Sequence, residues 1–185
     1  MAEMMRRTAL EAMPPIVHGD AIAITPAPPL ARAIVRGDAV VAAAIGDAFG
    51  VPFPTSPCCA TVQGERAALW LGPDEWLLLA PDGDAVMPAL AAALGETPGA
   101  IIDVGHRQVG LSIAGTHAAT VLNGGCPLDL HHHAFPEGMC TRTVFGKTEI
   151  VLWRRAADQF HAEVARSFAA YAHGLLREIA VDIAA

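Results

Sequence analysis

Aromatic residues, lysine and charged residues are all scarce in this sequence of 185 residues. Aromatic side chains make up 5% of the chain and charged side chains 17%, and Lys147 is the single lysine. The 12 basic residues are outnumbered by 19 acidic residues, so the formal charge is -7. Binding to a nucleic-acid backbone requires clustered positive charge. The composition therefore excludes a nucleic-acid partner.

Long hydrophobic runs are missing as well, although 53% of the residues are hydrophobic. The longest stretch without a charged residue, 108–128, is interrupted by polar side chains and by four glycines. A membrane-spanning helix needs about 20 predominantly apolar residues. No apolar segment follows Arg6 and Arg7, as one would in a signal peptide. We therefore expect a cytoplasmic protein that does not enter a membrane.

Disulfide frameworks and common catalytic signatures are also absent. The four cysteines are Cys58, Cys59, Cys126 and Cys140, and their spacing matches neither a disulfide scaffold nor a redox motif. The sequence contains no G-x-S-x-G nucleophile elbow. We expect reduced thiols and no catalytic residue on this chain.

The first 29 residues differ from the rest because prolines are concentrated there. Proline fixes φ, removes a hydrogen-bond donor and disfavours helix at the preceding position. The segment 1–29 is therefore predicted to be an extended N-terminal arm. It is either a loose terminus or an arm that lies on a partner.

Residues 30–104 predict a ferredoxin-like α+β subdomain. Asp38 and Asp84 are suitable N-caps for two helices, Gly50 ends the first helix, and Gly64-Glu65 suits a two-residue hairpin loop. The expected order is βαβ(β)αβ, with strands at 31–35, 59–63, 66–71, 75–80 and 100–104 and helices at 38–49 and 84–94.

Residues 105–185 predict a second small α+β subdomain. Thr116 can cap a short helix, Gly146-Lys147 can form a second glycine-first hairpin loop, and Ser167 can begin an amphipathic last helix. The strands of this subdomain are expected at 108–114, 143–145, 148–153 and 160–164.

Two short motifs suggest ligands, but their spacing argues against both. Gly146-Lys147-Thr148 resembles the end of a phosphate-binding loop, yet Thr141 stands where that motif needs glycine, and a strand follows instead of a helix. His131–His133 lie near Asp129 and could suggest zinc. Three consecutive side chains usually point in diverging directions, so a solvated histidine loop is favoured and no metal site is expected.

Asp103, His106 and Arg107 cluster between two predicted strands, in the segment IIDVGHRQVG. Such a trio can serve acid–base chemistry or anion binding. An exposed corner held by one satisfied hydrogen bond is the commoner interpretation.

Four long segments together resemble the gamma subunit of heterotetrameric sarcosine oxidase, collinearly over about residues 30–180. They are AALWLGPDEWLLLAP (67–81), DVGHRQVGLSIAGTHAATVLNGGCPLDL (103–130), FPEGMCTRTVFGKTEIVLWR (135–154) and VARSFAAYAHGLLRE (164–178). The resemblance implies a holoenzyme of alpha, beta, gamma and delta subunits that carries FAD, FMN and NAD. That enzyme oxidises sarcosine to glycine and hydrogen peroxide, and the one-carbon unit leaves as formaldehyde or as methylenetetrahydrofolate. Gamma is then a non-catalytic subunit that supports assembly and holds no cofactor.

The gamma family is similar in fold to the folate-binding part of the glycine-cleavage T-protein and to the N-terminal domain of a tRNA-modification GTPase. The T-protein aspartate-x-serine-histidine segment corresponds to Asp103, Gly105 and His106, and its catalytic aspartate to Asp129. Gly105 replaces the serine, and Leu128 replaces the asparagine of the second motif.

The resemblance leaves two alternatives to the subunit open. One is a free-standing folate-binding protein of one-carbon transfer that uses Asp103, His106, Arg107 and Asp129. The other is a homodimerising domain like that of the GTPase.

Overall fold

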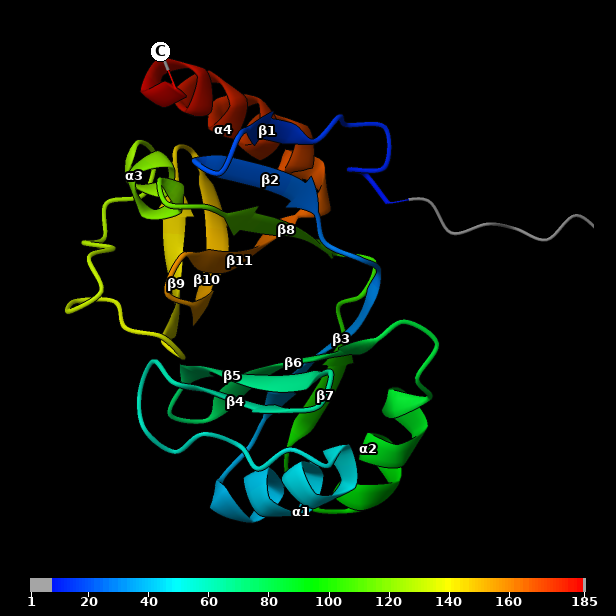
Figure 1. Ribbon diagram of the computed structural model, residues 1–185. Coiled ribbons are helices and arrows are strands. Elements are labelled where there is room, and N and C mark those ends of the chain that lie inside the picture. Colours follow the sequence, from blue (N-terminus) through cyan, green and yellow to red (C-terminus); the bar gives the residue numbers. More distant parts are fainter. Residues whose placement is uncertain (1–7, 185) are drawn as a thin grey trace, which may run out of the picture.

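The computed structural model describes residues 8–184, which fold into two antiparallel sheets with helices outside them (Figure 1). Each sheet belongs to one α+β unit, and the predicted fold class is confirmed. No helix in this described part of the chain has the length and apolar character needed to cross a bilayer.

The first unit has the predicted ferredoxin-like order. Its five strands are arranged β4-β5-β6-β3-β7, and two helices cover one face. The elements are β3 (Leu30–Arg36), α1 (Ala39–Phe49), β4 (Ala60–Gln63), β5 (Arg66–Gly72), β6 (Glu75–Pro81), α2 (Val86–Leu94) and β7 (Ala100–Asp103).

Neighbouring residues in the sequence explain both ends of α1 but not the beginning of α2. The Asp38 carboxylate accepts hydrogen bonds from Val40 N and Val41 N, and Gly50 ends α1 with a φ of 76°, both as predicted. The prediction that Asp84 caps α2 is wrong: α2 has no side-chain cap, and the Asp84 carboxylate instead accepts hydrogen bonds from the Arg66 guanidinium. A charged partner on a neighbouring strand outcompetes the backbone amides for this carboxylate.

The second unit is a six-stranded sheet in the order β1-β2-β8-β11-β10-β9, with helices on one face. Its elements are β1 (Ile16–His18), β2 (Ile22–Pro26), β8 (Gln108–Ala114), α3 (Ala118–Asn123), β9 (Cys140–Phe145), β10 (Thr148–Ala156), β11 (Gln159–Ala165), a 3₁₀ turn (Arg166–Phe168) and α4 (Ala169–Ala184).

The N-terminal segment is not an arm separate from the two units. Strands β1 and β2 extend the second sheet, and β2 pairs antiparallel with β8. Ile16, Ile22 and Ile24 are buried in the core under this sheet. The prolines lie before β1, at the last position of β2 and in the linker to β3, so they do not interrupt strand pairing. Residues 1–7 of the predicted arm lie outside the described residues.

The Gly146-Lys147 loop is a plain hairpin turn, as predicted. Thr148 pairs with Phe145 across β9 and β10, and Gly146 has a φ of 58°. The Tyr171 hydroxyl accepts a hydrogen bond from Lys147 N at 3.0 Å. A Cβ at Gly146 would lie 2.3 Å from that hydroxyl, so both the backbone angle and the packing of α4 require glycine here.

The two units stack sheet against sheet, which gives four layers with helices on the outside (Figure 1). One core lies under α3 and α4 and another under α1 and α2. A third, between the sheets, includes Ile34, Leu77, Val151 and Trp153. Alanines on the buried face of α4 allow this helix to approach its sheet closely, which accounts for part of the apolar excess without aromatics.

If β1 and β2 belong to the core, truncating Ile24 should destabilise the whole protein. We expect Ile24→Ala to lower the free energy of unfolding by about 2–5 kcal/mol, because the side chain is fully buried. Val17→Ala on β1 is the control, since Val17 is 59% exposed. Urea unfolding measures both variants. If both variants lowered the free energy of unfolding by the same small amount, β1 and β2 would not be part of the core.

Candidate functional site

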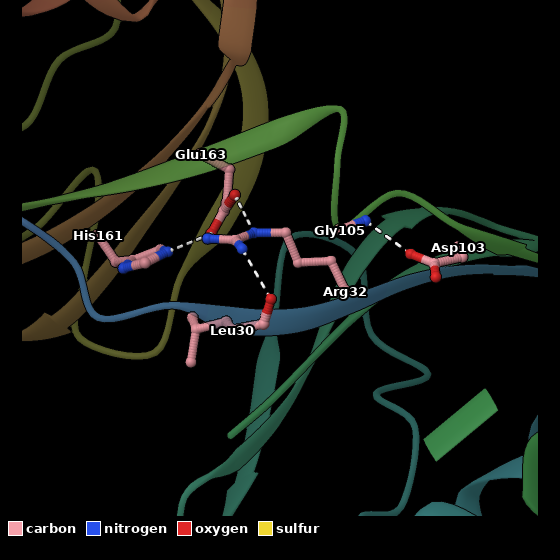
Figure 2. Close-up of polar contacts among 6 residues, drawn as sticks. All are labelled: Leu30, Arg32, Asp103, Gly105, His161 and Glu163. Atoms are coloured by element: carbon pink, nitrogen blue, oxygen red, sulfur yellow. Dashed lines mark hydrogen bonds and ion pairs between the residues drawn. The ribbon is translucent and has the colours of Figure 1, made fainter. Parts of the chain in front are cut away.

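A buried ionic cluster joins the two sheets (Figure 2). The Arg32 guanidinium from β3 donates to both carboxylate oxygens of Glu163 on β11, at 2.7 and 3.0 Å, and to the Leu30 carbonyl at 2.9 Å. His161 Nε2 lies 2.7 Å from Glu163 Oε1. All three residues are at most 5% exposed. The cluster therefore satisfies a charge pair that neither sheet could bury alone.

Strand alternation explains how these polar residues reach the interface. Phe160, Ala162 and Val164 of β11 face the helices, so His161 and Glu163 face the other sheet. The strand was predicted from its apolar residues Phe160, Ala162 and Val164, and the alternating His161 and Glu163 were not identified as buried. The sequence did carry a signal for them, because two ionisable residues alternate with the apolar face of one strand.

The electrostatics of the cluster favour an ionised Glu163. Burial by itself raises the pKa of the Glu163 carboxyl. The hydrogen bond and charge of His161, together with those of Arg32, outweigh that effect and hold the pKa below its usual value. Glu163 is thus ionised, and its carboxylate is held by Arg32 and His161.

Asp103 and His106 lie beside this cluster, at the corner between β7 and β8. Gly105 N donates to Asp103 Oδ1 at 2.8 Å, which closes the corner (Figure 2). A cavity of about 210 Å³ is lined by both predicted residues and by Asp82, Asp84 and Phe49, among others. A second cavity of about 40 Å³ adjoins the same corner on the side of residues 8–10.

The other two predicted residues are not part of this corner cavity. Arg107 lies in a separate hollow of about 140 Å³ together with Lys147. Asp129 belongs to the loop between α3 and β9, and its carboxylate accepts a hydrogen bond from His131 N at 2.9 Å. In Figure 1 this loop and the connection between β7 and β8 lie on opposite sides of the molecule. The structure therefore brings together Asp103 and His106 but not all four residues.

The corner does not fit a folate. Sites for ligands of that size have volumes of about 300–1,000 Å³, whereas the corner cavity has about 210 Å³. The Asp103 carboxylate is already used by the adjacent backbone, and Asp129 lies elsewhere. No step of one-carbon transfer is therefore assigned to the described residues.

An apolar groove runs along α1 in the first unit. Its volume is about 560 Å³, and its walls include Ala42, Ala43, Phe53, Trp70 and Trp76. Asp47 is the only charged residue in its lining. The groove offers no basic residue to the phosphates of FAD, FMN or NAD, so it does not fit those cofactors.

The cysteines are free, and Cys140 is held in the core between the sheets. Burial raises the pKa of its thiol to about 12. The thiol donates to the Cys59 carbonyl at 3.2 Å. Cys140 is therefore an inert packing residue and not a nucleophile.

Comparison with known families gives one match over most of the chain. The model of the family described as "Sarcosine oxidase, gamma subunit family" matches residues 35–182. The sarcosine oxidase subunit gamma of Corynebacterium sp. (strain P-1) is 36% identical over 132 residues, which are 71% of this chain and 64% of that protein. The Arthrobacter sp. subunit gamma is 37% identical over 125 residues, 68% of this chain and 60% of that protein. The matched part thus spans less than two thirds of these relatives.

Solved structures extend the likeness to the whole described fold. A chain of the heterotetrameric sarcosine oxidase from Corynebacterium sp. U-96, solved with pyrrole 2-carboxylate, superposes with a TM-score of 0.91 and 26% identity over 97% of both chains. The glycine cleavage system aminomethyltransferase T from Bartonella henselae gives a TM-score of 0.64 at 15% identity, covering 83% of this chain and 44% of that one. The second match shows a shared fold alone.

Removing the charge of Glu163 should be far more costly than breaking a surface ion pair. We expect Glu163→Gln to lower the free energy of unfolding by about 3–5 kcal/mol, because it leaves Arg32 charged and unpaired between the sheets. The matched control is Asp74→Asn, which breaks the exposed Arg36–Asp74 pair and should cost less than about 1 kcal/mol. Urea unfolding at pH 7 measures both, and similar losses would contradict the role of the cluster.

The same cluster predicts a specific pH dependence. Because folding lowers the pKa of Glu163, its contribution is present above the unfolded value of about 4.3 and is lost as the pH falls through the lower folded value. The stability gap between the wild type and Glu163→Gln should therefore shrink from pH 5 towards pH 2. Urea unfolding across this range measures the gap, and a gap that does not change would exclude a lowered pKa.

Proposed function

Because this chain belongs to the sarcosine oxidase gamma subunit family, we propose that it is the gamma subunit of a heterotetrameric sarcosine oxidase. The observation that carries the proposal is the superposition over 97% of both chains with a chain of such an enzyme, together with the family match over residues 35–182. The partners in this proposal are alpha, beta and delta subunits, in the cytoplasm.

The proposed holoenzyme oxidises sarcosine to glycine, with formation of hydrogen peroxide. The one-carbon unit leaves as formaldehyde, or as methylenetetrahydrofolate when tetrahydrofolate is present. FAD, FMN, NAD and the folate are assigned to other subunits, because the corner cavity is too small for folate and the α1 groove has no basic group for a phosphate.

The role of this chain is structural. The hydrogen bonds from Arg32 to Glu163 join the two sheets of the chain, and His161 contacts Glu163 from the same strand, so this cluster is committed to the fold. A free-standing folate-binding protein is not favoured, because the cavity that Asp103 lines does not include Asp129. The loop between α3 and β9, which contains Asp129, lies on the opposite side of Figure 1 from the connection between β7 and β8. The chain supports the assembly of the subunits that carry out the chemistry.

The groove on α1 is the surface that we assign to a large subunit. Apolar surface of this kind marks interaction sites on soluble proteins, and here it is lined by alanines, prolines and the rings of Phe53, Trp70 and Trp76. Asp47 is the single charge in the lining. The complementary occupant is an apolar segment of the large subunit that carries one basic residue opposite Asp47.

Co-expression with the other subunits tests this assignment. Ala43→Arg places a long cation in the groove, and we expect it to weaken assembly at least about tenfold, since a charge is then buried in an apolar interface. Ala91→Arg on the exposed face of α2 is the matched control and should leave assembly unchanged. The yield of this chain on a tagged large subunit measures both variants, and urea unfolding checks that each one folds.

The results distinguish an error in the assigned interface from an error in the proposed subunit role. Equal assembly of both variants would remove the groove from the interface while leaving the subunit role intact. Failure of the wild-type chain to co-purify with any large subunit would overturn the subunit role itself.

A further inference from the structure

Three consecutive histidines converge on one small volume of the surface. The sequence favoured diverging side chains for His131, His132 and His133, but one ring nitrogen of each lies within 4.8 Å of the other two. Their ring centroids are 3.9–5.2 Å apart. All three side chains are exposed and accessible from solvent.

The backbone of this turn explains the convergence. The His131 carbonyl accepts hydrogen bonds from Ala134 N at 2.9 Å and from Phe135 N at 2.8 Å. At the start of the turn, the Asp129 carboxylate accepts a hydrogen bond from His131 N at 2.9 Å. A single tight turn thus replaces the extended loop in which adjacent side chains alternate in direction.

Both ends of the turn are fixed to the core of the second unit. Leu130 and Phe135, which flank the histidines, are fully buried. The buried Arg154 guanidinium from β10 donates to both of their carbonyls, at 3.1 Å and 2.6 Å, and lies 4.6 Å from the centre of the Phe160 ring. This clamp holds the turn before any ligand arrives, which lowers the entropic cost of gathering three ligands.

The chemistry of three imidazoles is that of a transition-metal site. Imidazole nitrogen suits zinc, copper and nickel, whereas magnesium and calcium prefer oxygen ligands. Zinc–nitrogen bonds of about 2.0–2.1 Å place tetrahedral ligand atoms about 3.3 Å apart. The present separations between the ligand atoms are all within 4.8 Å.

We propose that the turn formed by His131, His132 and His133 binds one divalent first-row transition cation of the zinc class through the three imidazoles. The remaining coordination positions are open to water. This site is independent of the gamma-subunit role, because it uses neither the α1 groove nor the buried cluster.

Zinc titration of the full-length, untagged chain by calorimetry tests the site. We expect saturable binding of one Zn²⁺ per chain, weakened at least about tenfold in His132→Ala, because loss of a ligand costs no less than loss of an outer-shell partner. The control is His18→Ala, which removes a histidine of β1 and should leave the affinity unchanged. Urea unfolding verifies that both variants fold.

Nuclear magnetic resonance of the histidine rings gives a second readout. One equivalent of Zn²⁺ should shift the resonances of His131, His132 and His133 and leave those of His18 and His117 in place, and an excess of Mg²⁺ should not reverse the shifts. The proposal is overturned if no saturable binding occurs, or if His132→Ala binds zinc as tightly as His18→Ala does.

Discussion

The ion pair between Arg32 and Glu163 is the constraint on which the stacking of the two units depends. The partly exposed Arg142–Glu75 pair and the backbone hydrogen bonds from Ala60 N to the Gly138 carbonyl and from Cys140 N to the Cys58 carbonyl also join the two units. The buried core between the sheets is otherwise apolar, and apolar contacts tolerate sliding and rotation. A bidentate pair of this kind does not, because any other placement of the sheets leaves a buried charge without its partner. Through this pair, β3 of the first unit and β11 of the second hold the two sheets in one relative position.

This constraint also determines what the chain can do. The corner that holds Asp103 and His106 lies next to the cluster and is small, because Gly105 closes it with a hydrogen bond to Asp103. The open surface lies instead on the outer face of the first unit, along α1, and its lining is almost entirely apolar. A rigid body with a structural charge cluster inside and an apolar groove outside suits a subunit better than a free-standing enzyme.

Helix ends and hairpin turns that depend on neighbouring residues could be predicted from the sequence. A strand whose pairing partner lies far away in the sequence could not. Asp38 and Gly50 bound α1 as expected, and the glycine-first hairpins form at Gly64 and Gly146. Strand β2 was not predicted because its partner β8 lies more than 80 residues away, and β1 was not predicted because it joins the sheet through β2. The prolines were the stronger local signal in this segment.

In the candidate site, too, residues near one another in the sequence were grouped correctly, and residues far apart were not. Asp103 and His106 are close in sequence and close in space, whereas the grouping with Asp129 came from family resemblance and is not reproduced by the geometry. The Arg32–Glu163 pair joins residues 131 positions apart. The convergence of the three histidine side chains was not predicted, because the shape of their turn depends on Arg154, a residue of a later strand.

Native mass spectrometry tests the central claim, membership in a heterotetramer, most directly. The complex would be purified through a tag on the largest subunit and analysed intact. The account predicts one copy of this 19.3 kDa chain in a four-subunit particle, released as a folded monomer on mild activation. A particle that contains the large subunits without this chain, or this chain recovered only alone or as a symmetric dimer, would contradict it.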